Sequence, residues 1–400
     1  MKVDDIVILV GGKGKRINKI TKKVPKPLIK IGNKPFLEQI ISKVIKYNFK
    51  KIYLLCSYKK NFFIKKYHNK KIHNSKVFCV DEGQSKDTGG ALYNLTNKIK
   101  KNFILMNGDT FFDISFKELI SFDLKNYLGL IALTESKKLI NNKKLNQIGL
   151  NQKKEIFFTK NKSSLASGGI YLFSPKIFKF IENKKTSLEN DILKKLINKK
   201  KIKGNFFKEK LIDIGSYKQL NFLKKKNNFI KNKAFFLDRD GVINIDNGYI
   251  YKLSQFKFLP GIKRAINLLN KKNFLVIIVT NQASIGKGLM SEIKLKNIHN
   301  KMKQDIYRYK SSSIDDIYYA PYYKFSKKKK YRLNKNDRKP NIGMFLKAID
   351  KWNIDLSKSY FIGDKNTDEK ASLKAGIRFY YKQNISLYSQ VKKIILWVKK

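Results

Sequence analysis

The sequence contains few cysteines, prolines and acidic residues and no long apolar run, and each shortage excludes something. With only two cysteines, Cys56 and Cys79, the chain cannot build a disulfide framework, so we expect a reducing, cytoplasmic setting. Seven prolines and a hydrophobic content of 42% exclude a disordered chain. No apolar stretch reaches the length of a membrane span, and the apolar residues 6–10 lie between two aspartates and a pair of glycines. We therefore expect neither a signal peptide nor stable insertion into a membrane.

The shortage of acidic residues leaves a formal net charge of +58, from 88 Lys and Arg against 30 Asp and Glu. Such a charge invites a nucleic-acid-binding interpretation. The basic residues, however, are scattered over both halves, and the chain is also rich in Asn, Ile, Phe and Tyr. Because all these residues have A/T-rich codons, genome composition explains the excesses together. We therefore predict no nucleic-acid partner, and expect a positive field that attracts anionic sugar phosphates and nucleotides.

The length of 400 residues exceeds the usual size of one hydrophobic core, so the sequence predicts two domains. Short apolar strands alternate with amphipathic helices in both halves, which is typical of α/β sheets. The polar stretch 224–228 separates predicted domains at 1–228 and 233–382. Residues 386–400 predict a packing helix, with a membrane-surface helix as the alternative. Strands are predicted at residues 6–10, 51–56, 77–80, 102–106, 129–134, 234–238, 274–280, 316–320 and 359–362, and helices begin near residues 35, 89 and 187.

Polar residues of the second half follow predicted strands, at the edge where ligands bind in open parallel sheets. They are Asp238 and Asp240, Thr280 and Asn281, Lys339 in a loop, and Asp364. An aspartate that attacks phosphorus needs a cation to neutralise charge and a second acid to protonate the leaving oxygen. Gly241 permits the turn that lets Asp238 and Asp240 face the same way. Helix capping explains any one of these groups, but not four in order.

This order of motifs resembles the haloacid-dehalogenase superfamily of phosphohydrolases. The resemblance implies that Asp238 is the nucleophile and a Mg²⁺ ligand. It implies that Asp240 is the general acid and base, with its backbone carbonyl on the metal. It further implies that Thr280 and Asn281 bind phosphate and that Lys339 neutralises charge.

The same resemblance makes Asp364 a further Mg²⁺ ligand and lets Asp368 act through the metal shell. Within the superfamily, residues 233–382 are most similar to heptose 1,7-bisphosphate phosphatases, with histidinol-phosphate phosphatases as close relatives. By this resemblance Arg338 and Lys287 contact the second phosphate of the substrate.

One departure concerns a zinc loop that such phosphatases often carry, built from a Cys-x-His pair and a Cys-x-Cys pair. The corresponding positions here are Ala320, Tyr322, Lys335 and Asp337, and the second half has no cysteine. We therefore expect no zinc. The loop over 322–335 must be held in another way, for which its tyrosines are candidates.

The first half opens with a glycine-rich loop after its first predicted strand. Gly11, Gly12 and Gly14 let backbone amides approach phosphate oxygens, and Arg16 adds charge. Such loops are common, so the motif has little specificity by itself. Lys26 strengthens it, because prolines on both sides hold this lysine on a rigid, extended segment.

Two carboxylates complete this set, since Asp109 and Asp213 each follow a short apolar strand. Mg²⁺ is usually held by one or two carboxylates and substrate phosphates. The order of motifs resembles the sugar-1-phosphate nucleotidyltransferases over residues 5–225. The resemblance implies that a sugar 1-phosphate attacks the α-phosphorus of a nucleoside triphosphate and releases pyrophosphate. It assigns Arg16 to the pyrophosphate, Lys26 to the reacting phosphates, and Asp109 with Asp213 to Mg²⁺.

The nucleotidyltransferase resemblance also assigns Gly89 and Gly90 to the nucleobase side and Gly169 to the sugar side. Three positions depart from the residues usual in the family, which are Thr, Glu and Asn; here they are Lys15, Thr159 and Ser167. The sugar and the base are therefore less well determined than the reaction type.

The two resemblances fit one another and imply an α/β fold with two Rossmann-like domains, a mixed sheet followed by a parallel sheet. The phosphatase product keeps its 1-phosphate, and the transferase needs a sugar 1-phosphate. The first half is most similar to heptose 1-phosphate guanylyltransferases, so the resemblance implies a bifunctional enzyme that uses GTP to make GDP-heptose for lipopolysaccharide or another surface glycan. The sequence gives no oligomeric state.

Three alternatives stay open. The first is a nucleotidyltransferase for another sugar 1-phosphate, such as mannose 1-phosphate, joined to an independent phosphatase. The second is a chain with one catalytically inactive, regulatory half. The third is a basic nucleic-acid binder, which predicts salt-sensitive retention of DNA or RNA.

Overall fold

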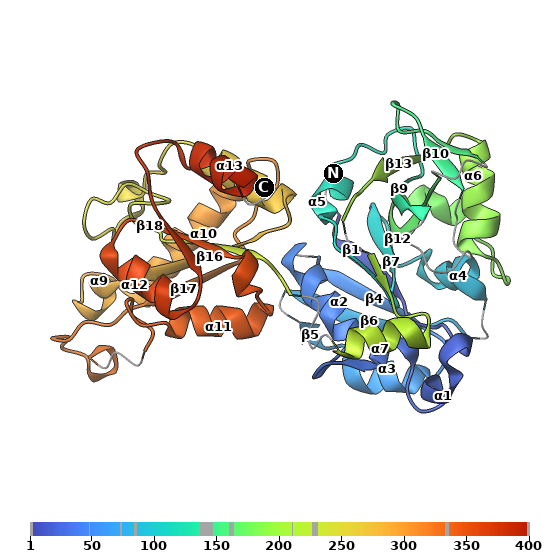
Figure 1. Ribbon diagram of the computed structural model, residues 1–400, viewed down its shortest axis with the longest axis horizontal. Coiled ribbons are helices and arrows are strands. Elements are labelled where there is room, and N and C mark those ends of the chain that lie inside the picture. The colour runs from blue at the N-terminus through green and yellow to red at the C-terminus, as the bar shows by residue number, and fades with distance from the viewer. Residues whose placement is uncertain are drawn as a thin grey trace. The chain divides into compact units, whose positions relative to one another are not determined.

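The structure is a computed structural model that describes residues 3–397 except 48, 73, 84–85, 137–146, 160–163, 210, 226–230 and 333–335. Lys335, a position of the expected zinc loop, lies outside the described residues. The chain divides into two compact units, Met1–Phe229 and Ile230–Lys400. We call them unit 1 and unit 2, and each is coloured continuously along the chain in Figure 1.

Unit 1 is built on a mixed sheet whose centre is parallel. The parallel strands are β7 (Phe103–Asn107), β1 (Asp5–Leu9), β4 (Lys51–Cys56) and β6 (Ser75–Asp81), in this order. Beyond β7, the long strand β12 (Leu165–Phe173) runs antiparallel and pairs with β9 (Gly129–Glu135). The remaining strands of this sheet are β5 (Lys71–Ile72), β10 (Ile148–Leu150), β11 (Ile156–Phe158) and β13 (Ile202–Phe206).

Two small antiparallel ribbons and several helices complete unit 1. One ribbon pairs β8 with β14 and the other pairs β2 with β3. Their bounds are β8 (Thr110–Phe112), β14 (Leu211–Asp213), β2 (Lys30–Ile31) and β3 (Lys34–Pro35). The α-helices are α1 (Asn18–Thr21), α2 (Phe36–Val44), α3 (Lys60–Tyr67), α4 (Asp87–Gly90), α5 (Phe116–Ile120), α6 (Lys194–Asn198) and α7 (Tyr217–Lys225).

Unit 2 has a parallel five-stranded sheet in the order β17-β16-β15-β18-β19. Its strands are β15 (Ala234–Leu237), β16 (Leu275–Asn281), β17 (Asp316–Ala320), β18 (Tyr360–Gly363) and β19 (Arg378–Tyr381). The central strands consist almost entirely of buried apolar residues, as expected for a parallel sheet covered on both faces. The predicted fold class, a mixed sheet followed by a parallel one, is confirmed.

Helices cover both faces of the unit 2 sheet, as Figure 1 shows for α13 on one side and α11 on the other. The helices are α8 (Ile262–Lys271), α9 (Ala283–Gly286), α10 (Glu292–Tyr307), α11 (Gly343–Trp352), α12 (Asn366–Lys374) and α13 (Leu387–Trp397). On α13, Leu387 and Val391 are fully buried in the core that contains Ile266 of α8. On α11, the ring of Phe345 lies 5.2 Å from those of Phe236 and Phe361.

The apolar pattern predicts the parallel strands of both units well. It misses the nine-residue strand β12, which contains Gly168 and Gly169, and the short outer strands. Strand β15 ends at Leu237, so Asp238 lies just beyond its carboxyl end. The strands β10, β11, β13 and β19 were not predicted, because they have three to five residues and pair at the periphery. Among the described helices, none is long and apolar enough to cross a lipid bilayer.

Candidate active sites

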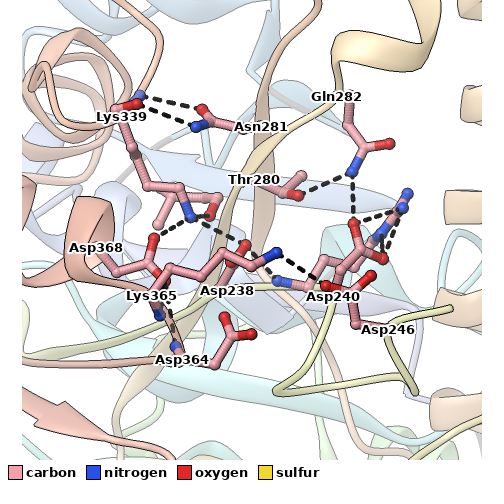
Figure 2. Close-up of polar contacts among 12 residues, drawn as sticks. Asp238, Asp240, Asp246, Thr280, Asn281, Gln282, Lys339, Asp364, Lys365 and Asp368 are labelled. Atoms are coloured by element: carbon pink, nitrogen blue, oxygen red, sulfur yellow. Dashed lines mark hydrogen bonds and ion pairs between the residues drawn. The ribbon is translucent and has the colours of Figure 1, made fainter. Parts of the chain in front are cut away.

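The candidate site of unit 2 lies where β15, β16 and β18 end side by side. Strand β15 pairs in parallel with both neighbours, so the residues that follow these strands meet at one edge. Asp238 is held there by its backbone N–H, which donates to the carbonyl of Ile362 at 3.0 Å. Its side chain is buried, and it faces Lys339 in Figure 2. The topology therefore brings together motifs that are far apart in the sequence.

Lys339 is the centre of charge of this site. Its Nζ lies 3.0 Å from Oδ1 of Asp238 and 2.5 Å from Oδ1 of Asp368, and the lysine is only 3% exposed. Burial lowers the pKa of Lys339, but the two carboxylates outweigh this and raise it above its ordinary value. The lysine therefore favours its charged form, and in such a buried environment a cation acts strongly on a neighbouring anion.

Asn281 holds Lys339 through the backbone. Its Oδ1 accepts from the backbone N–H of Lys339 at 3.0 Å, and its Nδ2 donates to the carbonyl of Lys339 at 3.1 Å. Both side-chain polar atoms are thereby committed, as Figure 2 shows. This arrangement makes Asn281 a support for Lys339, and the phosphate contact expected of Asn281 stays a prediction.

Three carboxylates could hold a metal ion. One oxygen each of Asp238, Asp364 and Asp368 lies within 4.8 Å of the others. Within the described residues, Oδ1 of Asp364 is buried and accepts no hydrogen bond. An all-oxygen set with an uncommitted carboxylate oxygen fits Mg²⁺, whereas zinc favours sulfur and nitrogen. Gly241 makes this cluster possible, because a Cβ at this position would overlap the carboxylate of Asp364.

Crowding of carboxylates changes their protonation. Burial raises the pKa of Asp238 to about 7, with Asp368 and Asp240 adding to the rise and Lys339 opposing it. Burial also raises the pKa of Asp364. A cation among these groups would favour their ionised forms, and a carboxylate must be ionised to act as a nucleophile.

Asp240 is fixed beside Asp238 by its own set of partners. Nη2 of Arg239 donates to both oxygens of Asp240 at 2.8 Å, and Nδ2 of Asn244 donates at 2.9 Å. Nε2 of Gln282 is 2.9 Å from both Asp240 Oδ2 and Thr280 Oγ1. The carboxylate of Asp240 is thus outside the three-carboxylate cluster, and the predicted metal contact of this residue is through its carbonyl.

Lys287 and Arg338, the predicted contacts to a second phosphate, are close in sequence to residues of this site. Lys287 follows α9 and is exposed, with its Nζ 4.7 Å from the ring centroid of Tyr249 and 4.8 Å from that of Tyr323. Arg338 precedes Lys339, and its Nη1 donates to the carbonyl of Tyr322 at 3.2 Å. A hydrogen bond with Tyr249 raises the pKa of Lys287, while the charge of Arg338 acts in the opposite direction. The two cations are therefore close enough to interact.

The candidate site of unit 1 is centred on Lys26. Its Nζ lies 2.6 Å from Oδ2 of Asp109 and 3.6 Å from Oδ1 of Asp213. Asp109 directly precedes β8 and Asp213 ends β14, and these two strands pair antiparallel. The ribbon therefore brings together two carboxylates separated by about a hundred residues, with the buried lysine between them.

The glycine-rich loop of unit 1 has free space around Gly12 but is tightly packed at Gly11. Gly14 has a φ of +61°, which favours glycine, and a Cβ at Gly12 would meet nothing within 4 Å. At Gly11 a Cβ would lie 2.6 Å from Oε1 of Glu82, so this carboxylate lies against the loop. Burial raises the pKa of Glu82 to about 7, and nearby aspartates contribute. Arg16 is exposed.

The glycines assigned to the nucleobase and sugar sides have structural partners. The backbone N–H groups of Gly89 and Gly90 donate to the carbonyl of Thr186 at 2.8 and 3.2 Å. These amides are thus engaged with the chain, and the assignment of the two glycines to the nucleobase side stays a prediction. Gly169 has a φ of +75°, and a Cβ there would lie 2.6 Å from Nδ2 of Asn107.

Several further site residues were not singled out from the sequence. Lys365 follows β18 and pairs with Asp246 at 2.8 Å, beside Asp364 in Figure 2. Gln282 and Arg239 adjoin predicted motifs, so their position next to these motifs was the available signal. Glu82 had only its place after a predicted strand.

Comparison with known proteins gives matches in both units. The family model described as "Nucleotidyl transferase" matches residues 5–229, and "Polynucleotide kinase 3 phosphatase" matches residues 233–385. D-glycero-beta-D-manno-heptose-1,7-bisphosphate 7-phosphatase of Haemophilus ducreyi is 38% identical over 146 residues, covering 36% of this chain and 80% of that protein.

Solved structures match unit 1. A putative glucose-1-phosphate thymidylyltransferase from Bacillus anthracis has a TM-score of 0.50 at 17% identity and covers 56% of this chain and 95% of its own, which shows the fold. HddC from Yersinia pseudotuberculosis has a TM-score of 0.47 at 27% identity, over 56% of this chain and 99% of its own.

The folds, the buried lysines and the matches together define two enzymes of phosphate-ester chemistry in one polypeptide. The chain belongs to the nucleotidyl transferase family over more than half its length, and its second half belongs to a phosphatase family of haloacid-dehalogenase-like fold. The prediction of a nucleotidyltransferase joined to a phosphatase is thus confirmed.

Proposed function

We propose that unit 2 removes the 7-phosphate of D-glycero-D-manno-heptose 1,7-bisphosphate and that unit 1 joins the resulting heptose 1-phosphate to a nucleotide, making GDP-heptose in the cytoplasm. The observation that carries the first step is the buried Lys339 between Asp238 and Asp368. The substrate is inferred from the named relative, of which this chain spans 80%.

In the first half-reaction, an oxygen of Asp238 attacks phosphorus while the bond between phosphorus and the sugar oxygen breaks. Asp240 supplies the proton that the leaving sugar oxygen takes up. Lys339 neutralises the negative charge that gathers on the transferring phosphoryl group. A water then attacks the phosphorus of the phospho-aspartate and Asp240 takes up its proton. The bond between phosphorus and the Asp238 oxygen breaks, which regenerates the carboxylate and releases inorganic phosphate.

Mg²⁺ is proposed at both sites, as a Lewis acid that neutralises phosphate charge. In unit 2 the residues that would hold it are Asp238 and Asp364, with the carbonyl of Asp240 and with Asp368 nearby. In unit 1 they are Asp109 and Asp213. Lys26 already links these two carboxylates, so phosphate binding would place an anion beside an existing cation.

In unit 1, an oxygen of heptose 1-phosphate attacks the α-phosphorus of the triphosphate, and the bond to the β-phosphate oxygen breaks. Lys26, which is held beside Asp109, contacts the reacting phosphates in this proposal, and the exposed Arg16 binds the leaving pyrophosphate. No covalent bond to the protein is needed, so catalysis consists of positioning and charge neutralisation.

The choice of GTP is supported by Glu82. This buried carboxylate lies against Gly11 of the glycine-rich loop and directly follows β6, the strand next to β4. Guanine presents adjacent N–H donors on one edge, and an ionised carboxylate offers two acceptor oxygens that fit such a pair. Adenine and the pyrimidines lack this donor pair. We therefore expect Glu82→Gln to reduce the preference for GTP over ATP.

A one-pot assay tests the whole proposal. Purified protein is given heptose 1,7-bisphosphate, Mg²⁺ and each nucleoside triphosphate in turn, and phosphate and nucleotide sugar are measured. We expect phosphate release with every nucleotide and a nucleotide sugar with GTP. Asp238→Asn should stop both products, and added heptose 1-phosphate should restore the nucleotide sugar. Absence of phosphate release would contradict the phosphatase substrate, and phosphate release without any nucleotide sugar would contradict the transferase substrate.

A further inference from the structure

Glu292, the first residue of α10, joins two tyrosines from different parts of unit 2. Its Oε2 accepts from the hydroxyl of Tyr319 on β17 at 2.7 Å, and its Oε1 accepts from that of Tyr331 at 2.5 Å. We call Glu292, Tyr319 and Tyr331 the tyrosine clamp. Burial opposes ionisation of Glu292, but the hydrogen bonds from Tyr331 and Tyr319 prevail and lower its pKa. These are therefore charge-assisted hydrogen bonds, the stronger kind.

The clamp fixes one end of a loop that follows β17. Within this loop, residues 321–332, the N–H of Tyr323 donates to the carbonyl of Tyr331 at 2.9 Å. The N–H of Ser326 donates to Tyr323 at 3.1 Å, and Nε of Arg332 donates to the carbonyl of Ser326 at 2.6 Å. Tyr331 is buried, so the loop folds back on a residue that the clamp holds.

The other end of the same loop holds the two cations assigned to the second phosphate. The ring of Tyr323 lies beside Lys287, and the carbonyl of Tyr322 accepts from Arg338. Helix α9, which leads to Lys287, packs on this loop as well, since a Cβ at Gly286 would lie 2.7 Å from the carbonyl of Pro321. The positions of both cations therefore depend on the loop.

We propose that Glu292 is a positioning residue for substrate choice: through Tyr319 and Tyr331 it sets the loop that places Lys287 and Arg338 for the phosphate that is not cleaved. This inference rests on the proposed sugar bisphosphatase activity. It separates two tasks in unit 2, because Asp238 and Lys339 act on the cleaved phosphate without contacting the loop residues named above.

The test compares a substrate with two phosphates and one with a single phosphate. KM and kcat are measured for heptose 1,7-bisphosphate and for p-nitrophenyl phosphate with wild type, Glu292→Ala and Tyr331→Phe. We expect KM for the bisphosphate to rise about tenfold with kcat nearly unchanged, because hydrogen bonds to a charged group are lost. Turnover of p-nitrophenyl phosphate should not change. The matched control is Lys329→Gln, an exposed lysine of the same loop.

A double variant and an exchange measurement sharpen the result. Glu292→Ala combined with Tyr331→Phe should equal Glu292→Ala alone, because both remove the same contact. Hydrogen exchange at the amides of Tyr323 and Ser326 should become faster in both single variants and stay unchanged in the control.

The outcomes distinguish the two proposals. A wild type with the same KM for both esters overturns the bisphosphatase proposal, and this inference with it. A wild type that prefers the bisphosphate, with variants that keep this preference, overturns the inference alone. Equal losses on both esters, or unchanged exchange in the loop, also overturn it, since they show damage to the whole site or no effect on the loop.

Discussion

The two candidate sites differ in how deeply their charged side chains are buried. In unit 2 the proposed nucleophile Asp238, its partner Lys339 and Asp368 are nearly inaccessible, at 5%, 3% and 0% exposure. In unit 1 Lys26 is similarly buried, while Arg16 is exposed and Asp109 and Asp213 are half-buried.

The difference follows from the chemistry proposed for each. A carboxylate that forms a covalent bond must be desolvated and aimed before the substrate arrives, because it is part of the reaction. A site that only aligns two substrates can stay open, since the substrates carry the reacting atoms. A buried nucleophile that is already paired with a lysine therefore indicates covalent catalysis. An open loop with exposed cations indicates catalysis by substrate positioning.

Asp238→Asn gives the largest expected effect and tests whether the two sites work independently. An amide is not a nucleophile toward phosphorus, so phosphate release should fall by about 10³-fold or more. Nucleotidyl transfer to supplied sugar 1-phosphate should stay at wild-type level. Asp305→Asn, which removes the same charge from a residue paired with Lys301 and Arg308 on α10, is the control. Loss of both activities in Asp238→Asn would contradict two independent sites.

Lys339→Met tests how much unit 2 depends on its buried cation. The change leaves Asp238 and Asp368 buried without their counter-ion, which should cost about 3–5 kcal/mol of unfolding free energy. Both tryptophans, Trp352 and Trp397, belong to unit 2, so urea unfolding followed by tryptophan fluorescence reports this unit alone. A midpoint equal to that of the wild type would show that these carboxylates are neutral in the folded protein.

Lys26→Ala is the matching change in unit 1. It removes the cation between Asp109 and Asp213, so nucleotidyl transfer should fall by about 10²-fold, with phosphate release unaffected. Lys23→Ala changes an exposed lysine of the same segment and should have no effect. Steady-state assays of both reactions make the measurement. If Lys23→Ala were as inactive as Lys26→Ala, the lysines of this segment would act by general attraction of anionic substrates, and Lys26 would have no specific role.

Mg²⁺ should stabilise unit 2 by binding the folded form only. At a hundred times its Kd the gain is about 2.7 kcal/mol, measured by the same fluorescence with and without EDTA. Asp364→Asn should remove most of this gain, because Asp364 offers an uncommitted buried oxygen. Stabilisation of the variant equal to that of the wild type would place the ion elsewhere.

The smallest expected effect is the pH dependence of Glu82. Its pKa is raised from 4.5 to about 7, so the folded state binds this proton more tightly than the unfolded state does. The free energy of unfolding therefore falls as the pH rises from about 4.5 to 7. Glu82→Gln does not show this fall, because glutamine does not titrate. The variant should gain roughly 1–2 kcal/mol over wild type at pH 8 relative to pH 5, measured by calorimetry of unit 1. A pH-independent difference would contradict the raised pKa.

Local pattern was enough for most of the framework of both units, but not for β12, whose apolar run is interrupted by two glycines. The apolar runs that become β1, β4, β15 and β16 stand out because buried parallel strands are continuously hydrophobic. Residues just after such strands, such as Asp238, could be predicted as site residues, because the carboxyl ends of parallel strands meet at one edge of the sheet. The short strands β10 and β19 could not, since three or four residues carry no clear period.

By itself the sequence determined the chemistry available at each strand end: carboxylates, a lysine, glycines, and the absence of cysteine from the second half. Only the tertiary structure decided that Asn281 supports Lys339, that the amides of Gly89 and Gly90 bind Thr186, and that Glu292 joins Tyr331. The reason is distance along the chain. Periodicity and capping act over a few residues, whereas these contacts join residues from tens to about a hundred positions apart and exist only once the elements have packed.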